Sequence, residues 1–507
     1  MTAAAGPAAR AAGPASRQPV AAAGRLAVTE PAAGQSAGAL RNLLALTDPG
    51  SFLQVGSQAR HRATAFDMQR KRPPGDGVLT GIGRVDGRPV ALFAQDPKVL
   101  GGSLGEMHAA KIVRMMELAA RGRMPVVGLL DSGGARIQEG VAALDGYGCI
   151  FSANVLQSGR IPQLSVVLGP CAGGAAYSPA LTDIVIMVRG RANMFLTGPK
   201  VVRAVSFEDV TADELGGPDV HARRSGVAHL VAPDVDSGLA LARRVLSYLP
   251  SSCFDPPPLA LPADPEEMPE LPANPRQAYD VRGVVRGVVD GGSFLELQEQ
   301  FSRNIVIGFA RVQGAPVGVV ANQPQALAGT LDIGASEKAA RFVRLCDAFG
   351  LPLVTLVDTP GFRPGTAQEA GGVIRKGAKL LYAFAEATVP RVTVVLRKAF
   401  GGAYIVMNSK VLGADAVFAW PGTELAVMGA DGAIDVIFRR ELAADPGRRA
   451  ELVERYRAEA GTPQLAAERL SVDEIIDPGD TYAAVATTLR HLAGASSCRY
   501  RHDNMPQ

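Results

Sequence analysis

The chain has 507 residues, of which 47% are hydrophobic and 20% charged, and its net charge at pH 7 is +3. A length above ~300 residues exceeds what one hydrophobic core normally organises, so we expect at least two domains. The small net charge argues against a nucleic-acid partner or a membrane surface, and no apolar run reaches the ~18 residues that a membrane helix needs.

Residues 1–38 are mostly alanine, glycine and proline, with Arg10, Arg17 and Arg25 and no acidic residue before Glu30. This charge pattern is also typical of an organellar transit peptide. Repeated glycine and proline disfavour the amphipathic helix of such a peptide, so we interpret the segment as a disordered tail. We therefore expect a cytoplasmic bacterial protein rather than one of the mitochondrial matrix.

Residues 39–254 alternate strand and helix patterns in the manner of an α/β domain. The strand predicted at 125–130 is apolar except for Gly128, as expected of a parallel strand buried on both faces. The many prolines of residues 255–275 fix φ and remove backbone donors, which predicts an extended linker. The predicted elements of this first half are a β-rich pair at 81–94, a helix at 107–121, and strands at 125–130 and 164–168.

Residues 276–507 repeat the pattern of the first half. Residues 81–90 return as 308–317, and the same offset of 227 positions aligns Pro97 with Pro324 and Asp131 with Asp358. Self-similarity with the period of a whole domain predicts two copies of one α/β fold, each with a related site. The predicted elements of the second half are a β-rich pair at 308–321, a helix at 337–349, and strands at 352–357 and 392–396.

Each half carries a glycine turn between a strand and a helix, at residues 173–175 and 401–403. The first amides of a helix lack intrahelical partners, and the helix dipole favours negative charge in front of them. Glycines that merely permit a tight turn are the alternative interpretation, but two turns at matching positions favour a pair of oxyanion sites. We expect Gly173 and Gly174 to stabilise an anion in the first half, and Gly402 and Ala403 to do so in the second.

A glycine-containing loop follows an aspartate in each half, at residues 131–140 and 358–365. We expect the amides of Gly134 and Ala135 to add donors to the first site. Ser132 is not interpreted as a nucleophile, because no G-x-S-x-G motif surrounds it and no histidine is suitably placed.

Neither histidines nor cysteines indicate a metal site. The six histidines show no metal-ligand spacing, and the five isolated cysteines form no C-x-x-C pair, which suits a reducing compartment. Two anion sites without an evident acid–base residue between them suit a reaction whose proton acceptor comes from a cofactor or a substrate.

These residues resemble the β subunit, or carboxyltransferase component, of biotin-dependent acyl-CoA carboxylases of the propionyl-CoA/acetyl-CoA type. The resemblance covers the chain from about Asp48 to Pro478. The motifs of the first half that carry it are 131–141, 169–175, 215–217, His221 and 225–228, and those of the second half are 274–276, 279–282, 358–363, 397–404 and 419–422.

The resemblance implies two crotonase-like domains, usually in a hexamer built from rings of three. It implies that acyl-CoA lies on the first domain of one subunit and that biotin reaches in from the second domain of a partner. Carboxybiotin would release CO2, the biotin anion would take the α-proton, and the resulting enolate would attack CO2.

The resemblance also implies roles for individual residues. Gly173 and Gly174 would hold the thioester oxygen, and Gly402 and Ala403 the biotin carbonyl. The residues implied to contact substrate are Gly134, Ala135, Tyr404 and Ile405, and those implied to contact biotin are Gly361 and Phe362.

The sequence departs from the family pattern in three places. The N-terminal segment is short and rich in alanine, Tyr482 stands where an arginine is usual, and Ile405 stands where propionyl-CoA-type members have an aspartate. The position of Ile405 is linked in the family to the choice of acyl chain, so the preferred acyl-CoA stays open; an ordinary packing role for Ile405 is the alternative.

The chain has no biotinyl Met-Lys-Met motif and no ATP-grasp domain. We therefore expect a partner α subunit that carries biotin and biotin carboxylase, with no metal held by this chain. Two alternatives to a carboxylase subunit remain at this stage, namely a biotin-dependent acyl-CoA decarboxylase subunit and a non-catalytic scaffold that binds acyl-CoA.

Overall fold

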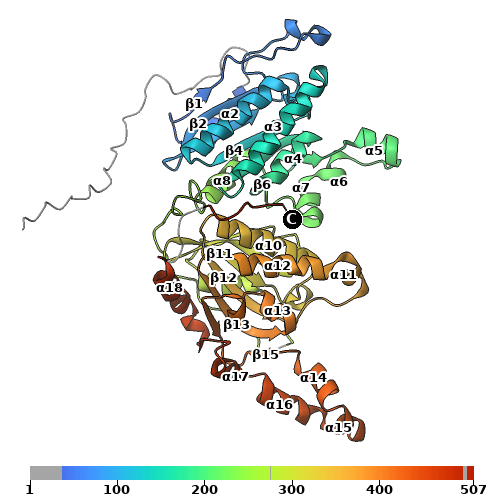
Figure 1. The fold of residues 1–507 in the computed structure, drawn as a ribbon, viewed down its shortest axis with the longest axis vertical. Helices are drawn as coiled ribbons and strands as arrows, with labels where there is room; N and C mark the ends of the chain where they lie inside the picture. Colours follow the sequence, from blue (N-terminus) through green and yellow to red (C-terminus); the bar gives the residue numbers. More distant parts are fainter. Residues whose placement is uncertain (1–36, 275, 495–499, 507) are drawn as a thin grey trace, which may run out of the picture.

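The computed structural model describes residues 37–274, 276–494 and 500–506, and Figure 1 shows two α/β halves stacked along the long axis. The tail predicted at 1–38 lies outside the described residues except for its last two, which begin helix α1 (Ala37–Leu46). No helix in the described ranges is long and apolar enough to cross a membrane.

Each half is built on one sheet of eight strands, and the two sheets have the same strand order. In the first sheet the order is β1 (Leu53–Val55), β2 (Val78–Val85), β3 (Arg88–Gln95), β4 (Val126–Ser132), β5 (Gln163–Ala172), β6 (Ile184–Val188) and β8 (Leu230–Ala232), and β7 (Asn193–Phe195) pairs with β5. In the second it is β9 (Leu295–Leu297), β10 (Ile305–Val312), β11 (Ala315–Asn322), β12 (Leu353–Thr359), β13 (Arg391–Phe400), β14 (Ala416–Ala419) and β16 (Glu474–Ile475), and β15 (Glu424–Ala426) pairs with β13.

The register confirms the duplication that the sequence predicts. Strand β3 meets β4 in parallel from the pair Ala91 and Val126, and β11 meets β12 from Gly318 and Leu353, both 227 positions later. In each half an antiparallel hairpin comes first and parallel strands follow. The central parallel strands are almost wholly buried, which explains their nearly continuous apolar sequence.

Helices cover both faces of each sheet. In the first half α2 (Glu106–Gly122) and α3 (Val141–Gln157) enclose one apolar cluster, while α1 and α8 (Val235–Leu246) pack on the other face. In the second half α10 (Ile333–Ala348) and α12 (Val373–Glu386) take the inner face, and α9 (Val281–Val288) and α18 (Thr481–Leu492) the outer one. The remaining helices are α4 (Gly174–Leu181), α5 (Pro199–Ser206), α6 (Ala212–Gly216), α7 (Pro218–Val220), α11 (Thr366–Gly371), α13 (Gly401–Val406), α14 (Ala430–Ile437), α15 (Arg439–Ala444), α16 (Arg449–Ala460) and α17 (Pro463–Glu468).

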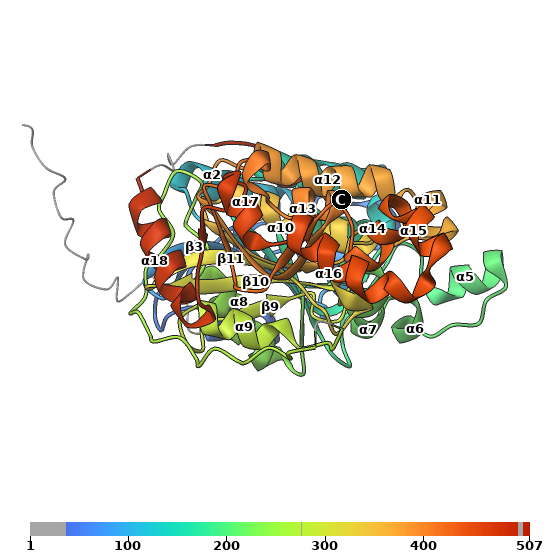
Figure 2. The same ribbon diagram turned by 90° about the horizontal axis from the view of Figure 1, so that it is seen from below.

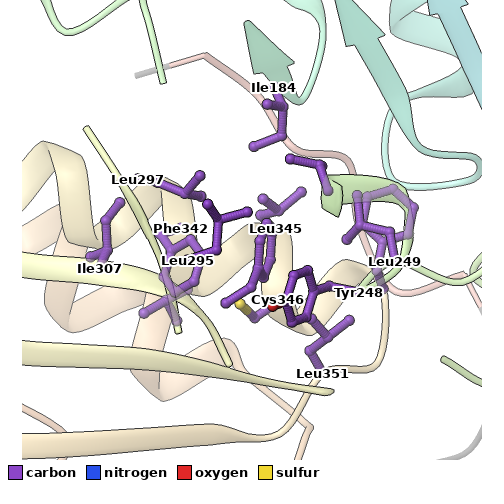
Figure 3. Packing of buried hydrophobic residues seen from close by; sticks show 14 of the residues in the cluster. Ile184, Tyr248, Leu249, Leu295, Leu297, Ile307, Phe342, Leu345, Cys346 and Leu351 are labelled. Atoms are coloured by element: carbon purple, nitrogen blue, oxygen red, sulfur yellow. The ribbon is translucent and has the colours of Figure 1, made fainter. Parts of the chain in front are cut away.

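The two halves share one apolar cluster. Ile184, Tyr248 and Leu249 of the first half lie against Leu345 and Leu351 of the second, as Figure 3 shows. Residues 500–506 run between the halves, where the C-terminus is marked in Figure 1. Contact over so much buried apolar surface fixes the halves relative to each other.

The proline-rich segment 255–274 contains no helix and only an isolated bridge, between Pro265 and Asp290. Its course is extended, while Pro275 lies outside the described residues. The segment also packs on the second half, since Met268 and Leu271 contact the outer-face cluster.

Candidate functional site

The glycine turns occupy equivalent places at the ends of strands β5 and β13. Gly173 and Gly401 both have φ of +60°, a conformation that side chains disfavour. Each turn leads into a short helix whose first amides have no partner within the helix. The first glycine of each turn is therefore explained by the backbone conformation alone.

The structure distinguishes the two glycines of the first turn. Gly173 donates its N–H to the carbonyl of Phe195 on strand β7, at 3.0 Å. Gly174 follows as the first residue of α4, where its N–H points out of the helix start. The donor role predicted for both Gly173 and Gly174 is thus available to Gly174 and not to Gly173 in this conformation, while Gly402 and Ala403 are the second and third residues of α13, after Gly401.

The two loop glycines have positive φ and donate hydrogen bonds within their own loops. Gly134 has φ of +99° and donates to Ser132 Oγ at 3.2 Å. Gly361 has φ of +135° and donates to Thr359 Oγ1 at 3.3 Å. Ser132 is therefore an acceptor within the loop.

The residue after each loop glycine presents its amide. Leu104 N–H donates to Gly134 O and Arg136 N–H donates to Leu104 O, both at 2.9 Å. Leu331 makes the same two bonds around Phe362. Because these bonds use the groups on either side, the N–H groups of Ala135 and Phe362 point away from Leu104 and Leu331. Neither N–H has an acceptor in the described part of the chain. Each half therefore offers one loop amide and one helix-start amide, the two-donor arrangement of an oxyanion hole.

The loop and the glycine turn of each half are neighbours. A Cβ built on Gly134 would come within 2.8 Å of Ala172 O, the carbonyl just before the first glycine turn. In the second half, the ring of Phe362 comes within 4.0 Å of a Cβ built on Gly402.

A buried ion network supports the loop of the first half. Arg136 is 1% exposed, and its Nη1 lies 2.7 Å from both Asp76 Oδ1 and Glu139 Oε1. Asp76 also accepts the backbone N–H of His108 at 3.0 Å. Burial raises the pKa of Asp76, against the opposing influence of Arg136. This network fixes the residue next to Ala135.

The second half has no equivalent beneath its loop, because Arg363 is exposed and lies 3.9 Å from Asp332. An ion pair instead joins the strand ends, where Asp358 accepts from Arg397 Nε at 3.0 Å. Burial raises the pKa of Asp358, and Arg397 opposes the shift.

Two exposed side chains, Ile405 of α13 and Tyr177 of α4, lie beside the starts of these helices. Ile405 is 42% exposed, three residues after Gly402, so both lie on one face of α13. Its counterpart by the repeat is Tyr177, which is 51% exposed on α4. The sequence reasoning missed Tyr177, although the repeat offset points to it. The Tyr404 hydroxyl instead donates to Ser471 O at 3.4 Å, which favours a supporting role over contact with substrate.

The histidines of the first half are hydrogen-bonded to groups of the surrounding scaffold. His221 bonds Met194 O at 2.8 Å and Ser225 Oγ at 2.7 Å. His229 Nδ1 accepts the N–H of Val185 at 3.1 Å. Burial lowers the pKa values of His108, His221 and His229, so these rings are neutral and hydrogen-bonded. No cluster that would suit a metal ion occurs among the described residues.

A cavity of about 750 Å3 lies elsewhere. It is lined by the proline-rich segment at 267–273 together with Arg397 and Trp420. None of the predicted site residues lines it.

Residues 33–504 match the family model described as the carboxyl transferase domain. The chain belongs to the carboxyl transferase family. It is 52% identical to the propionyl-CoA carboxylase beta chain of Saccharopolyspora erythraea over 91% of this chain and 89% of that relative. It is 49% identical to the methylmalonyl-CoA decarboxylase subunit alpha of Veillonella parvula, over 92% of each chain.

Solved structures agree with the fold of this carboxyl transferase. A transcarboxylase 12S crystal structure, a hexamer assembly with methylmalonyl-coenzyme A and methylmalonic acid bound, superposes with a TM-score of 0.89 at 48% identity, covering 94% of this chain and 93% of that chain. The prediction of two duplicated crotonase-like domains is confirmed, as is the family resemblance read from the motifs.

Proposed function

We propose that this carboxyltransferase moves a carboxyl group between biotin on a partner protein and the α-carbon of a short acyl-CoA. The observation that carries the proposal is the pair of equivalent two-amide sites, one at each glycine turn. Two sites of one kind suit a reaction in which two carbonyl oxygens, one on each substrate, become negatively charged.

The first site suits a thioester. Ala135 and Gly174 offer amides where negative charge would develop on the thioester oxygen as the α-proton leaves. His108 and His229 are buried and bond to backbone groups of the scaffold, so this part of the chain presents no evident general base. That agrees with proton removal by the second substrate.

The second site suits biotin. Phe362 and Gly402 offer the amides, and the partly buried Phe362 ring adds an apolar face beside them. A polar carbonyl on an apolar fused ring matches that combination. When bound, biotin supplies the carboxyl group and the base, while the chain holds the oxygen and orients the ring.

The test is to remove one amide without disturbing the turn. Proline is tolerated in the first turn of a helix, and a Cβ on Gly402 meets nothing closer than the Phe362 ring at 4.0 Å. We expect Gly402→Pro to lower kcat by ~10²–10³-fold, because the N–H is lost. Gly402→Ala is the matched control, since it keeps the N–H, and should stay within about threefold of wild type. Equal activity of the two folded variants, assayed with the biotinylated partner, would refute the assignment.

The acyl preference is proposed to depend on Ile405. An isoleucine on the exposed face beside Gly402 gives an apolar wall, and each buried CH2 is worth ~0.8 kcal/mol. We expect a preference that is not strictly for propionyl-CoA, either broad or shifted toward acetyl- or longer acyl-CoA. Ile405→Asp should narrow the preference or move it toward propionyl-CoA by roughly tenfold. The measurement is kcat/KM for acetyl-, propionyl-, butyryl- and longer acyl-CoA, and unchanged ratios would assign Ile405 to ordinary packing.

A decarboxylase subunit is the second candidate, favoured by the Veillonella relative. Both readings use the same two sites in opposite directions. ATP-dependent carboxylation with a biotin carboxylase partner would support the carboxylase. Turnover of methylmalonyl-CoA only alongside a membrane-bound partner would support the decarboxylase.

We also propose a homohexamer with a partner α subunit that carries biotin and biotin carboxylase, in the cytoplasm of a bacterium. The α5 and α14 regions lie on one side of the molecule; α5 projects from the flank of the first half, and α14 lies near the far end of the second (Figures 1 and 2). Each exposes apolar side chains, with Phe207 88% and Val436 70% exposed. Light scattering after size exclusion would test the assembly, and a monomer at micromolar concentration would contradict it.

A further inference from the structure

Tyr147 of helix α3 lies directly against the helix-start glycine of the first half. A Cβ built on Gly174 would lie 2.8 Å from the Tyr147 ring, closer than a real side chain allows. Tyr147 is 4% exposed, so its ring cannot swing into solvent. The ring therefore fixes the position of the Gly174 backbone.

The hydroxyl end of the same ring faces the loop. Tyr147 Oη has no hydrogen-bond partner among the described residues, and the Ser132 hydroxyl is its neighbour. Ser132 Oγ accepts the Gly134 N–H at 3.2 Å, one residue before the presented amide of Ala135. One side chain thus reaches the supports of both amides in the first site.

The second half reaches the same arrangement with a different residue. The Phe362 ring lies 4.0 Å from a Cβ built on Gly402 and 2.9 Å from one built on Gly377 of helix α12. Phe362 comes from the loop, whereas Tyr147 comes from the helix that follows the loop. Two halves that place an aromatic ring beside the helix-start glycine from different elements indicate that the ring itself is needed there.

We propose that Tyr147 is a positioning residue for the acyl-CoA site, setting the separation of the Ala135 and Gly174 amides through its ring. This inference rests on the proposed function, because it takes those amides as the donors to the thioester oxygen. The ring affects the rate of the chemical step more than the binding of acyl-CoA, because the CoA moiety would be held elsewhere.

The experiment compares Tyr147→Phe, which keeps the ring, with Tyr147→Leu, which removes it. We expect Tyr147→Phe to stay within about threefold of wild type in kcat. Tyr147→Leu should lose about 10- to 100-fold in kcat with KM for acyl-CoA nearly unchanged, because displacing a reacting group by ~1 Å can cost 10²-fold. Phe52→Leu, which removes a buried ring on the other face of the first sheet, is the control and should retain kcat.

A double variant tests the contact itself. Gly174→Ala should be impaired because its Cβ meets the Tyr147 ring. Combined with Tyr147→Leu it should be no slower than Tyr147→Leu alone, since the clash is gone, so the two losses are not additive. Additive losses, a normal kcat for Tyr147→Leu, or equal damage from Tyr147→Phe would overturn the inference.

A failure of the proposed function would give a different activity pattern from a failure of the positioning role alone. If Gly174→Pro, which lacks the N–H altogether, retained activity, the amide would not be a donor and the site assignment itself would fall. If Gly174→Pro in the Tyr147→Leu background, where no ring opposes the new side chain, were far slower than Gly174→Ala in that background while Tyr147→Leu alone were normal, the site would stand and only the positioning role would be refuted.

Discussion

Replacing Arg136 by methionine should strongly destabilise the first half of the protein. The Arg136 and Asp76 side chains are 0% exposed and that of Glu139 is 4% exposed, and the guanidinium lies 2.7 Å from each carboxylate. Removing one member of a buried ion network leaves the others charged and without a partner, which costs about 3–5 kcal/mol. Here two carboxylates lose the same cation, so we expect a loss in the free energy of unfolding near the upper end of that range.

The repeat supplies a matched control. Arg363 stands 227 positions after Arg136, but its side chain is 46% exposed and 3.9 Å from Asp332. An exposed pair contributes about 1 kcal/mol or less, so Arg363→Met should be nearly neutral. Because the two substitutions are chemically identical, any difference between them reports burial and pairing.

The assay is urea unfolding followed by far-ultraviolet circular dichroism, with all variants at one protein concentration. The only tryptophan is Trp420, so its fluorescence reports the second half separately. The loss in Arg136→Met should shrink at acid pH, because burial raises the pKa of Asp76 and protonation removes its unpaired charge. Equal unfolding free energies for Arg136→Met and Arg363→Met would refute the reasoning.

Two further predictions concern histidines. His502 bonds Asp347 Oδ2 at 3.0 Å, and although burial alone would lower the pKa of His502, this bond raises it above 6.5. The stabilisation from this pair is therefore complete below pH ~6.5 and lost as pH rises through the raised pKa, so His502→Gln should flatten the decline in unfolding free energy above neutrality; an unchanged pH profile would contradict this. His108→Ala, His221→Ala and His229→Ala, tested singly and folded, should retain turnover, and a loss as large as ~10⁴-fold in any of them would require a protein general base.

The sequence alone determined the architecture and the repeated glycine turns on which the proposed sites rest. The duplication, the apolar parallel strands and the two glycine turns are local patterns with fixed spacing, and the structure reproduces them at the same offset. Helix α13 is short, since it begins at Gly401 and ends at Val406. It ends early because Asn408 takes a positive φ of +60°, which no helix accommodates.

Only the tertiary structure decided which amides are presented. The sequence cannot separate Gly173 from Gly174, because their difference depends on whether strand β7 brings the Phe195 carbonyl within 3.0 Å. Nor can it pair Arg136 with Asp76, or Tyr147 with Gly174, since these residues come from different elements and meet only when helices and strands pack. Backbone conformation and apolar periodicity are properties of neighbouring residues, whereas hydrogen-bond partners and contacts between rings and backbone depend on distances that the folded chain sets.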